Sequence, residues 1–114
     1  MDKLRSIKFF KDYFIKFYLS LDPKVQNKYD HVFVVIRQAE RIPKKFFKKI
    51  SDKKNLYEIR VEYGSNIYRT FCCFDRNEAI ILFNSFEKKS QKAPKRVIDK
   101  AVSIMKQYFD EKET

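Results

Sequence analysis

Two arginines in predicted strands are the residues of this sequence best suited to bind an anion. Arg60 lies in the alternating segment 56–63 and Arg69 in the apolar segment 67–74, and both segments have the pattern of β-strands. A guanidinium in such a strand needs a carboxylate partner or an anionic ligand. If the turn between the strands has two or four residues, the arginines face each other, and their repulsion favours an anion site. A three-residue turn breaks this pairing.

The same alternation offers a simpler explanation for Arg60. Glu58 and Glu62 stand two residues before and after it, so all three side chains share one face of the strand. An ion pair between Arg60 and either carboxylate would need no ligand. The residues alone leave both interpretations open.

Positive charge is concentrated on either side of these strands. The 114 residues include 26 Lys or Arg and 15 Asp or Glu, which gives a net charge of +11. Two basic clusters, 41–54 and 88–100, flank a nearly neutral segment. Solvated surface is the simplest account of lysine runs. However, a meander brings both clusters toward one edge, and so strong a field attracts polyanions, of which nucleic acid is the commonest and an acidic protein the main rival.

Glycine, histidine and cysteine are too few for several kinds of site. The one glycine, Gly64, excludes the G-x-G-x-x-G and G-x-x-x-x-G-K-[ST] phosphate loops. The one histidine, His31, is expected on a helix surface or in the core, and no Cys/His spacing suits zinc. We therefore expect neither a metal site nor a cofactor. Cys72 and Cys73 are neighbours that point to opposite faces of a strand, so we expect reduced core thiols.

The chain is expected to be a cytoplasmic protein without a membrane partner. No signal peptide is visible, and reduced cysteines suit that compartment. The longest apolar runs have five residues, whereas a bilayer span needs about 20.

Hydrophobic spacing predicts one α+β domain over residues 1–114. In the first half of the chain we expect an additional strand over 4–9 and helices over 11–21 and 23–39. A lysine-rich loop over 43–55 follows, with a short helical turn around Phe46 and Phe47. The second half is expected to contain strands over 56–63, 67–74 and 78–86 and a helix from Pro94 to Phe109. The last three strands form an antiparallel meander in a small twisted sheet. The helical hairpin covers one face, and the alternation leaves polar groups on the other.

Three motifs stand in order along the chain: LYEIRV at 56–61, IYRTF at 67–71 and FNSFEKKSQKAPKRVIDKA at 83–101. Together they resemble the HigB-like, phage-related branch of the RelE/ParE toxin superfamily, and the similarity extends over residues 4–109. The sequence departs from the family pattern at Cys72 and Cys73, where aromatic residues are common, and at Ala93, where threonine is usual.

This resemblance implies a RelE-like fold and the toxin of a type II toxin–antitoxin pair. Such a toxin cuts messenger RNA in the ribosomal A site, so its partners would be the ribosome, messenger RNA and an antitoxin, here a HigA-like helix-turn-helix protein. No small-molecule cofactor is implied. The alternatives are the gyrase inhibition of the ParE branch and a non-catalytic RNA- or protein-binding module.

The resemblance also implies roles for particular residues. The reaction would be attack of a ribose 2′-hydroxyl on the adjacent phosphorus without a metal. Arg60 and Arg69 would clamp the phosphate. Lys88 and Lys89 would add positive charge, and one of these two lysines could act as the acid. Glu58 would be either the base or an ion-pair partner. Two aromatic residues, Tyr68 and Phe86, are expected either to stack on RNA bases or to pack in the core. The lysines expected to contact RNA are Lys48, Lys49, Lys53, Lys54, Lys92 and Lys95.

Overall fold

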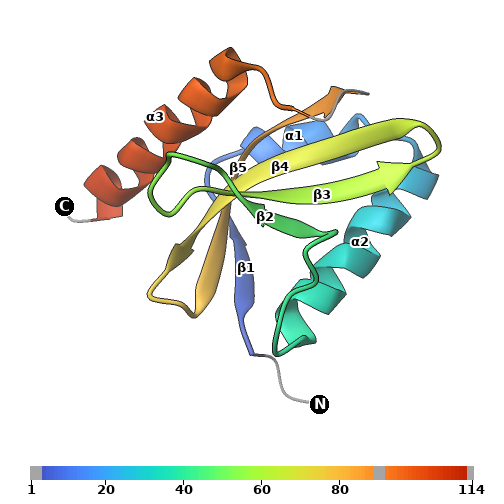
Figure 1. Cartoon of the computed structure of the whole chain (residues 1–114), viewed down its shortest axis with the longest axis horizontal. Coiled ribbons are helices and arrows are strands. Elements are labelled where there is room, and N and C mark those ends of the chain that lie inside the picture. Colours follow the sequence, from blue (N-terminus) through green and yellow to red (C-terminus); the bar gives the residue numbers. More distant parts are fainter. Residues whose placement is uncertain (1–3, 89–91, 113–114) are drawn as a thin grey trace.

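A five-stranded sheet with the strand order β1-β5-β4-β3-β2 organises the protein (Figure 1). The computed structural model describes residues 4–88 and 92–112. Its elements are β1 (Ser6–Phe9), α1 (Tyr13–Leu19), α2 (Pro23–Gln38), β2 (Phe47–Lys49), β3 (Tyr57–Tyr63), β4 (Asn66–Asp75), β5 (Ala79–Lys88) and α3 (Lys95–Lys112). Neighbouring strands are antiparallel except β1, which pairs in parallel with β5. The predicted α+β class with a mostly antiparallel sheet is confirmed.

Helices α1 and α2 cover one face of the sheet as a hairpin, as predicted. The side chain of Asp22 caps α2 by accepting a hydrogen bond of 2.8 Å from the Lys24 N–H, and Pro23 occupies the first turn, where no N–H is needed. The buried side chains between the hairpin and the sheet are Phe14, Val25, Tyr29, Val32 and Ile36 from the helices and Ile59, Val61, Tyr68, Cys72, Ile80 and Leu82 from the strands.

The opposite face is not polar throughout, which corrects the prediction. Helix α3 packs on it through Ala101 and Ile104, and the side chains buried beneath are Leu56, Phe71, Cys73, Ile81 and Phe83. Figure 1 shows α3 and α2 at opposite ends of the sheet. Strands β4 and β5 carry apolar side chains on both faces, so both need a cover. Polar groups nevertheless lie on this face, among them Asn84, whose amide donates to the Val97 carbonyl of α3 at 3.1 Å.

Strand β2 replaces the helical turn predicted around Phe46 and Phe47. The N–H of Phe46 donates to the carbonyl of Pro43 at 3.0 Å and closes a turn, after which Phe47 already belongs to the strand. With three residues, β2 is too short to show alternation in the sequence. Its two exposed lysines, Lys48 and Lys49, suit an edge strand, where charge discourages pairing with other chains.

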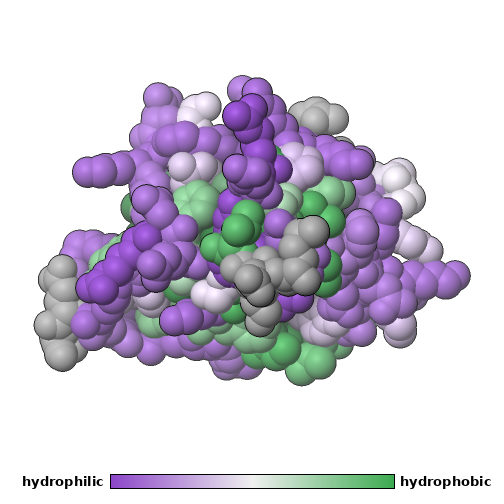
Figure 2. All heavy atoms as spheres, turned by 90° about the horizontal axis from the view of Figure 1, so that it is seen from below, coloured by the Kyte–Doolittle hydropathy of each residue, from purple (hydrophilic) through white to green (hydrophobic). Residues whose placement is uncertain are grey.

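The face of the molecule seen from below is largely hydrophilic (Figure 2). In the view from below, hydrophobic areas show only as smaller patches between hydrophilic side chains (Figure 2). Within residues 4–88 and 92–112, no helix combines the length and apolar character that a membrane span requires.

Cys72 and Cys73 are both buried, carry free thiols and lie in the cores on opposite faces of the sheet, as predicted. Burial raises the pKa of Cys72 well above its ordinary value and that of Cys73 to about 12. We expect neither thiol to react with a disulfide reagent in the native protein, because little thiolate forms at neutral pH. Thiol titration before and after denaturation should show reaction only in the unfolded chain. Rapid native reaction would contradict this burial.

Asp75 fastens the end of α3 to the turn between β4 and β5. The hydroxyl of Tyr108 donates to Asp75 Oδ2 at 2.6 Å, and Lys112 Nζ lies 2.7 and 2.6 Å from the two carboxylate oxygens. The hydrogen bonds from Lys112 and then from Tyr108 hold the pKa of Asp75 below its usual value. An ionised carboxylate therefore adds to the apolar packing that holds α3 over the sheet.

Acid should loosen this attachment. The pKa of Asp75 is lower in the folded than in the unfolded chain, so its ionised form stabilises the fold. This stabilisation is fully present above the ordinary aspartate pKa of about 3.9. It is lost as the pH falls through the pKa that Asp75 has in the folded chain. We expect Asp75→Asn to have a smaller free energy of unfolding near neutral pH and a shallower loss on acidification. Denaturant titrations over the acid range check this, and identical pH slopes for the two proteins would contradict it.

Candidate functional site

A two-residue turn brings the two strand arginines face to face. Strands β3 and β4 are joined by Gly64-Ser65, and this register places Arg60 directly opposite Arg69. Gly64 has φ +61°, the region that glycine adopts without strain and that tight hairpin turns require. A turn of two or four residues is the condition under which the sequence predicts that Arg60 faces Arg69, and this prediction is confirmed.

The carboxylate of Glu58 lies between the two guanidiniums. Arg69 Nε donates to Glu58 Oε2 at 2.9 Å, and Arg60 Nε is 3.5 Å from the same oxygen. The side chains are 0% exposed for Arg69, 8% for Glu58 and 16% for Arg60. The ion-pair alternative for Arg60 is therefore confirmed, and Arg69 shares the same carboxylate. We call Glu58, Arg60 and Arg69 the arginine–glutamate cluster.

Phe86 forms one wall of this cluster. It pairs with Arg69 across β4 and β5, and its ring centroid lies 5.7 Å from the Arg69 guanidinium carbon. The ring also stacks on Phe71, with centroids 5.9 Å apart and an interplanar angle of 14°. Phe86 is half-buried, so it packs on the core and also borders the polar part of the face.

Two cavities lined by basic side chains lie near the arginine–glutamate cluster, one lined by Glu58 and the other by Phe86, the neighbour of Arg69. The first, of about 230 Å³, is lined by Glu58 together with Lys48 and Lys49 from β2 and Lys92 from the segment before α3. The second, of about 510 Å³, is lined by Phe86 and, among others, Asn84, Lys88, Arg96 and Lys100. Lys48 and Lys49 of the basic cluster 41–54 and Lys92 of the basic cluster 88–100 therefore meet at this face, as the meander predicts.

Several predicted site residues lie elsewhere. Tyr68 is buried against the helical hairpin on the opposite face, so it cannot stack on a base here. The alternative prediction, that Tyr68 packs in the core, is confirmed. Lys54 lines a separate, mainly apolar cavity with Val102 and Met105 of α3. Lys95 pairs with Asp99 at 2.7 Å on the exposed side of α3, and this hydrogen bond raises its pKa.

Lys53 is half-buried in the loop after β2, where its carbonyl accepts a hydrogen bond of 2.8 Å from Lys49 Nζ. Lys89 lies outside the residues that the structure describes. His31 is exposed on α2, as expected, with its ring edge-to-face to Phe46 at 6.5 Å. In the described ranges, no group of three or more His, Cys, Asp or Glu side chains could hold a metal ion.

The site also contains residues that the sequence analysis does not single out. Arg96 and Lys100 belong to the second basic cluster, and their spacing of four on α3 is the signal that could have placed them together. No pattern in the sequence indicates that Asn84 belongs to the site. A register shift between Thr70 and Cys72 alters the β4–β5 pairing near it, and Asn84 Nδ2 donates to the Val97 carbonyl at 3.1 Å.

Removing Glu58 should destabilise the protein strongly. Glu58→Ala leaves the buried Arg69 without this carboxylate, a change that costs about 3–5 kcal/mol when one partner of a buried ion pair is lost. The double variant with Arg69→Met should recover much of the loss. Glu62→Ala, at an exposed position on the same strand, serves as the control and should stay within about 0.5 kcal/mol of the parent in urea unfolding. Equal losses for Glu58→Ala and Glu62→Ala would contradict the cluster.

Comparison with known proteins supplies a family and a fold. The model of the family described as "Phage derived protein Gp49-like (DUF891)" matches residues 16–106. A chain of the archaeal RelE–RelB complex from Pyrococcus horikoshii OT3 has a similar structure, with a TM-score of 0.52 and 18% sequence identity over 78% of this chain and 99% of that chain. The RelE-like fold is confirmed by this similarity. The search of curated proteins found no match.

Proposed function

The chain belongs to the Gp49-like family of phage-derived proteins, and from this premise we propose that it is the toxin of a toxin–antitoxin pair and cuts messenger RNA on the ribosome. The HigB-like motifs at 56–61, 67–71 and 83–101 support the specific branch. The structural similarity to a chain of a RelE–RelB complex supports an antitoxin partner. The antitoxin of this proposal is a HigA-like helix-turn-helix protein. The toxin acts on the ribosome and is located in the cytoplasm.

The observation that carries this proposal is the cavity in which Lys48, Lys49 and Lys92 lie beside Glu58 of the arginine–glutamate cluster. Arg60 is the more exposed of the two arginines, so it is the one accessible to a phosphate at this face. A charge-assisted hydrogen bond of this kind contributes about 1.5–3 kcal/mol. Arg69 is fully buried and holds Glu58, so it acts as a positioning residue rather than as a direct phosphate ligand.

In the proposed reaction, groups of this face act as base and acid. The ribose 2′-oxygen bonds to phosphorus and loses its proton to a base, for which Glu58 is the nearest carboxylate to Arg60. The bond from phosphorus to the 5′-oxygen breaks, and an acid protonates that oxygen. Lys88 lines the second cavity and is a candidate for the acid. The products are a 2′,3′-cyclic phosphate and a 5′-hydroxyl end.

One observation favours a second candidate, a non-catalytic RNA- or protein-binding module of the same fold. Both arginines already have Glu58 as a counter-ion, and Arg69 is closed off from solvent. Carboxylates beside arginine are often structural partners. In this alternative, the lysine-lined cavities bind a polyanion and nothing is cut.

Substituting Arg60 separates the two functions. We expect induction of the wild-type chain in bacteria to stop growth and to create new 5′-hydroxyl ends within translated messages. Arg60→Ala should reduce the cleavage by about 10²–10³-fold, the usual effect of removing one group that stabilises transition-state charge. Arg41→Ala removes an exposed arginine that lines none of the cavities described here, so it should retain full cleavage.

The folded state of Arg60→Ala should be checked by thermal unfolding, because Arg60 also contacts Glu58. A folded variant that cuts as well as the parent would overturn the role of Arg60. Absence of new ends with the wild-type chain itself would favour the non-catalytic module.

A further inference from the structure

The larger of the two cavities near the arginine–glutamate cluster has a buried hydrogen-bond acceptor without a partner. Asn84 lines this cavity of about 510 Å³ and is only 6% exposed. Its Nδ2 donates to the Val97 carbonyl at 3.1 Å, and because a carbonyl oxygen only accepts, this bond fixes which end of the amide is Oδ1. Among residues 4–88 and 92–112, no group donates to Oδ1. Buried polar groups are nearly always paired, so this acceptor favours a ligand that brings a donor.

The rest of the cavity combines apolar side chains with cations. The apolar side chains of the lining are Phe86, Pro94 and Val97, and the cationic ones are Lys88, Arg96 and Lys100. Within the described ranges, none of the three cations takes part in an ion pair. The first turn of α3 contributes Arg96 and Val97, and the positive end of the helix also favours an anion.

The one carboxylate of the lining does not neutralise these cations. Glu87 is exposed and pairs across the strands with Tyr68, whose side chain lies on the hairpin face of the sheet. Cross-strand partners share a face, so the side chain of Glu87 points away from Phe86 and Lys88. An anion in the cavity would therefore meet positive charge.

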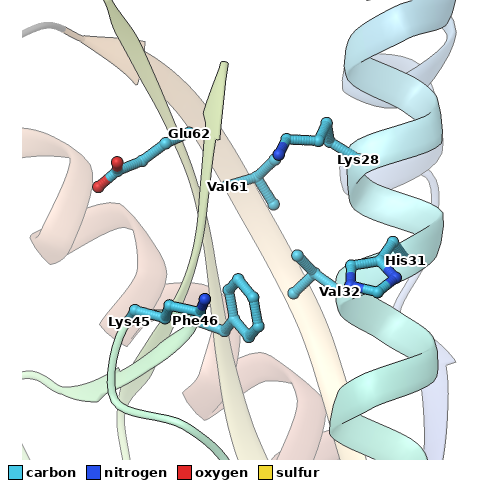
Figure 3. Close-up of a pocket in the computed structure, with 7 residues that line it drawn as sticks. All are labelled: Lys28, His31, Val32, Lys45, Phe46, Val61 and Glu62. Atoms are coloured by element: carbon cyan, nitrogen blue, oxygen red, sulfur yellow. The ribbon is translucent and has the colours of Figure 1, made fainter. Parts of the chain in front are cut away.

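The basic cavity on the hairpin side of the sheet lacks this combination. It has a volume of about 280 Å³ and lies between α2, the turn before β2 and β3, with Lys28 and Lys45 among its lining residues (Figure 3). In the described part of the chain, its lining contains no buried polar side-chain atom without a partner. Charge alone would attract an anion there, whereas the cavity at Asn84 also selects for a donor.

A nucleotide carries all the groups that the cavity at Asn84 can bind. Its phosphate can bind Arg96 and Lys100, and its flat base can lie against the half-buried ring of Phe86. An amino group on the base can donate to Asn84 Oδ1, whereas a simple anion would leave this acceptor unpaired. The volume also lies within the range of about 300–1,000 Å³ that is usual for small-molecule sites.

We propose that this cavity is a base-selective subsite, in which Asn84 Oδ1 accepts a hydrogen bond from the exocyclic amino group of adenine, cytosine or guanine. The subsite rests on the proposed function, since its ligand is one nucleotide of the bound RNA. Uracil has no amino group, and its one N–H lies between two carbonyl oxygens that would repel Oδ1. The subsite therefore favours RNA that places a base with an amino group beside Phe86.

Two ligands that differ by one amino group test this hydrogen bond. Adenosine 3′,5′-bisphosphate carries both phosphates of an RNA chain and offers no 5′-oxygen to cleave, and purine riboside 3′,5′-bisphosphate lacks only the amino group. In calorimetric titrations of the full chain we expect the adenosine ligand to bind about fivefold more tightly, the usual effect of one hydrogen bond. In NMR spectra it should shift the side-chain amide of Asn84. Equal affinity of the two ligands, or equally tight binding of inorganic phosphate, would overturn the subsite.

Variants of the chain test the position of the ligand. Arg96→Glu together with Lys100→Glu should weaken binding of adenosine 3′,5′-bisphosphate by about tenfold or more, because attraction becomes repulsion. As a matched control, Lys28→Glu together with Lys45→Glu makes the same charge change in the other basic cavity and should have a much smaller effect. An equal loss in both pairs would mean unspecific attraction and would contradict the subsite.

Replacing Asn84 tests the acceptor itself. Asn84→Leu keeps a side chain of similar size without the acceptor, and it should remove the difference in affinity between the two ligands. Thermal unfolding checks that the variant is folded, and the titrations of the parent chain decide the question without it. A preference for the adenosine ligand that persists in folded Asn84→Leu would exclude Asn84 as its cause.

These measurements separate the subsite from the proposed cleavage. RNA cleavage by a chain that binds both ligands equally would overturn the subsite and leave the proposed function intact. Binding that depends on the amino group, in a chain that cuts no RNA, would support the subsite and favour the non-catalytic RNA-binding module.

Discussion

The carboxylate of Glu58 is the interaction on which the centre of the molecule depends. The tight turn at Gly64-Ser65 forces Arg60 and Arg69 to opposite positions of the hairpin, where two like charges repel. Glu58 lies within reach of both guanidiniums, so the hairpin keeps this register. The ion pairs connect β3 with β4, and the contact of Arg69 with the Phe86 ring adds β5. A polar cluster thereby becomes part of the packed sheet.

The two faces of the sheet have different exposure because their helices cover them to different extents. The α1–α2 hairpin covers a continuous apolar core, in which the hydroxyls of Tyr29, Thr70 and Ser85 satisfy one another by hydrogen bonds of 2.9 and 2.8 Å. Helix α3 covers only the part of the other face that carries Phe71 and Phe83, and Asp75 holds its far end in place. The uncovered remainder is where the basic segments meet, so the position of α3 determines how open the candidate site is.

Local patterns predict most of the fold because they carry its strongest signals. The alternation in 56–63, the Asp22-Pro23 start of α2 and the apolar stripe after Pro94 each correspond to an element of the structure. The failures occur where the signal is short or non-local. Strand β2 has three residues, too few for a period, and becomes a strand only by pairing with β3. Likewise, the cover over Phe71 depends on where α3 packs, which its own sequence does not state.

For the candidate site, the sequence by itself determined the charged residues, their family resemblance and the condition under which Arg60 would face Arg69. Only the tertiary structure decided that the turn meets this condition, that Glu58 serves both arginines, and that Arg69 is buried while Arg60 reaches the surface. It also placed Tyr68 in the opposite core and brought Lys48 and Lys92 to one cavity. The physical reason is that residue types and periodicity act over a few neighbours, whereas burial and charge pairing depend on which strands and helices the folded chain brings together.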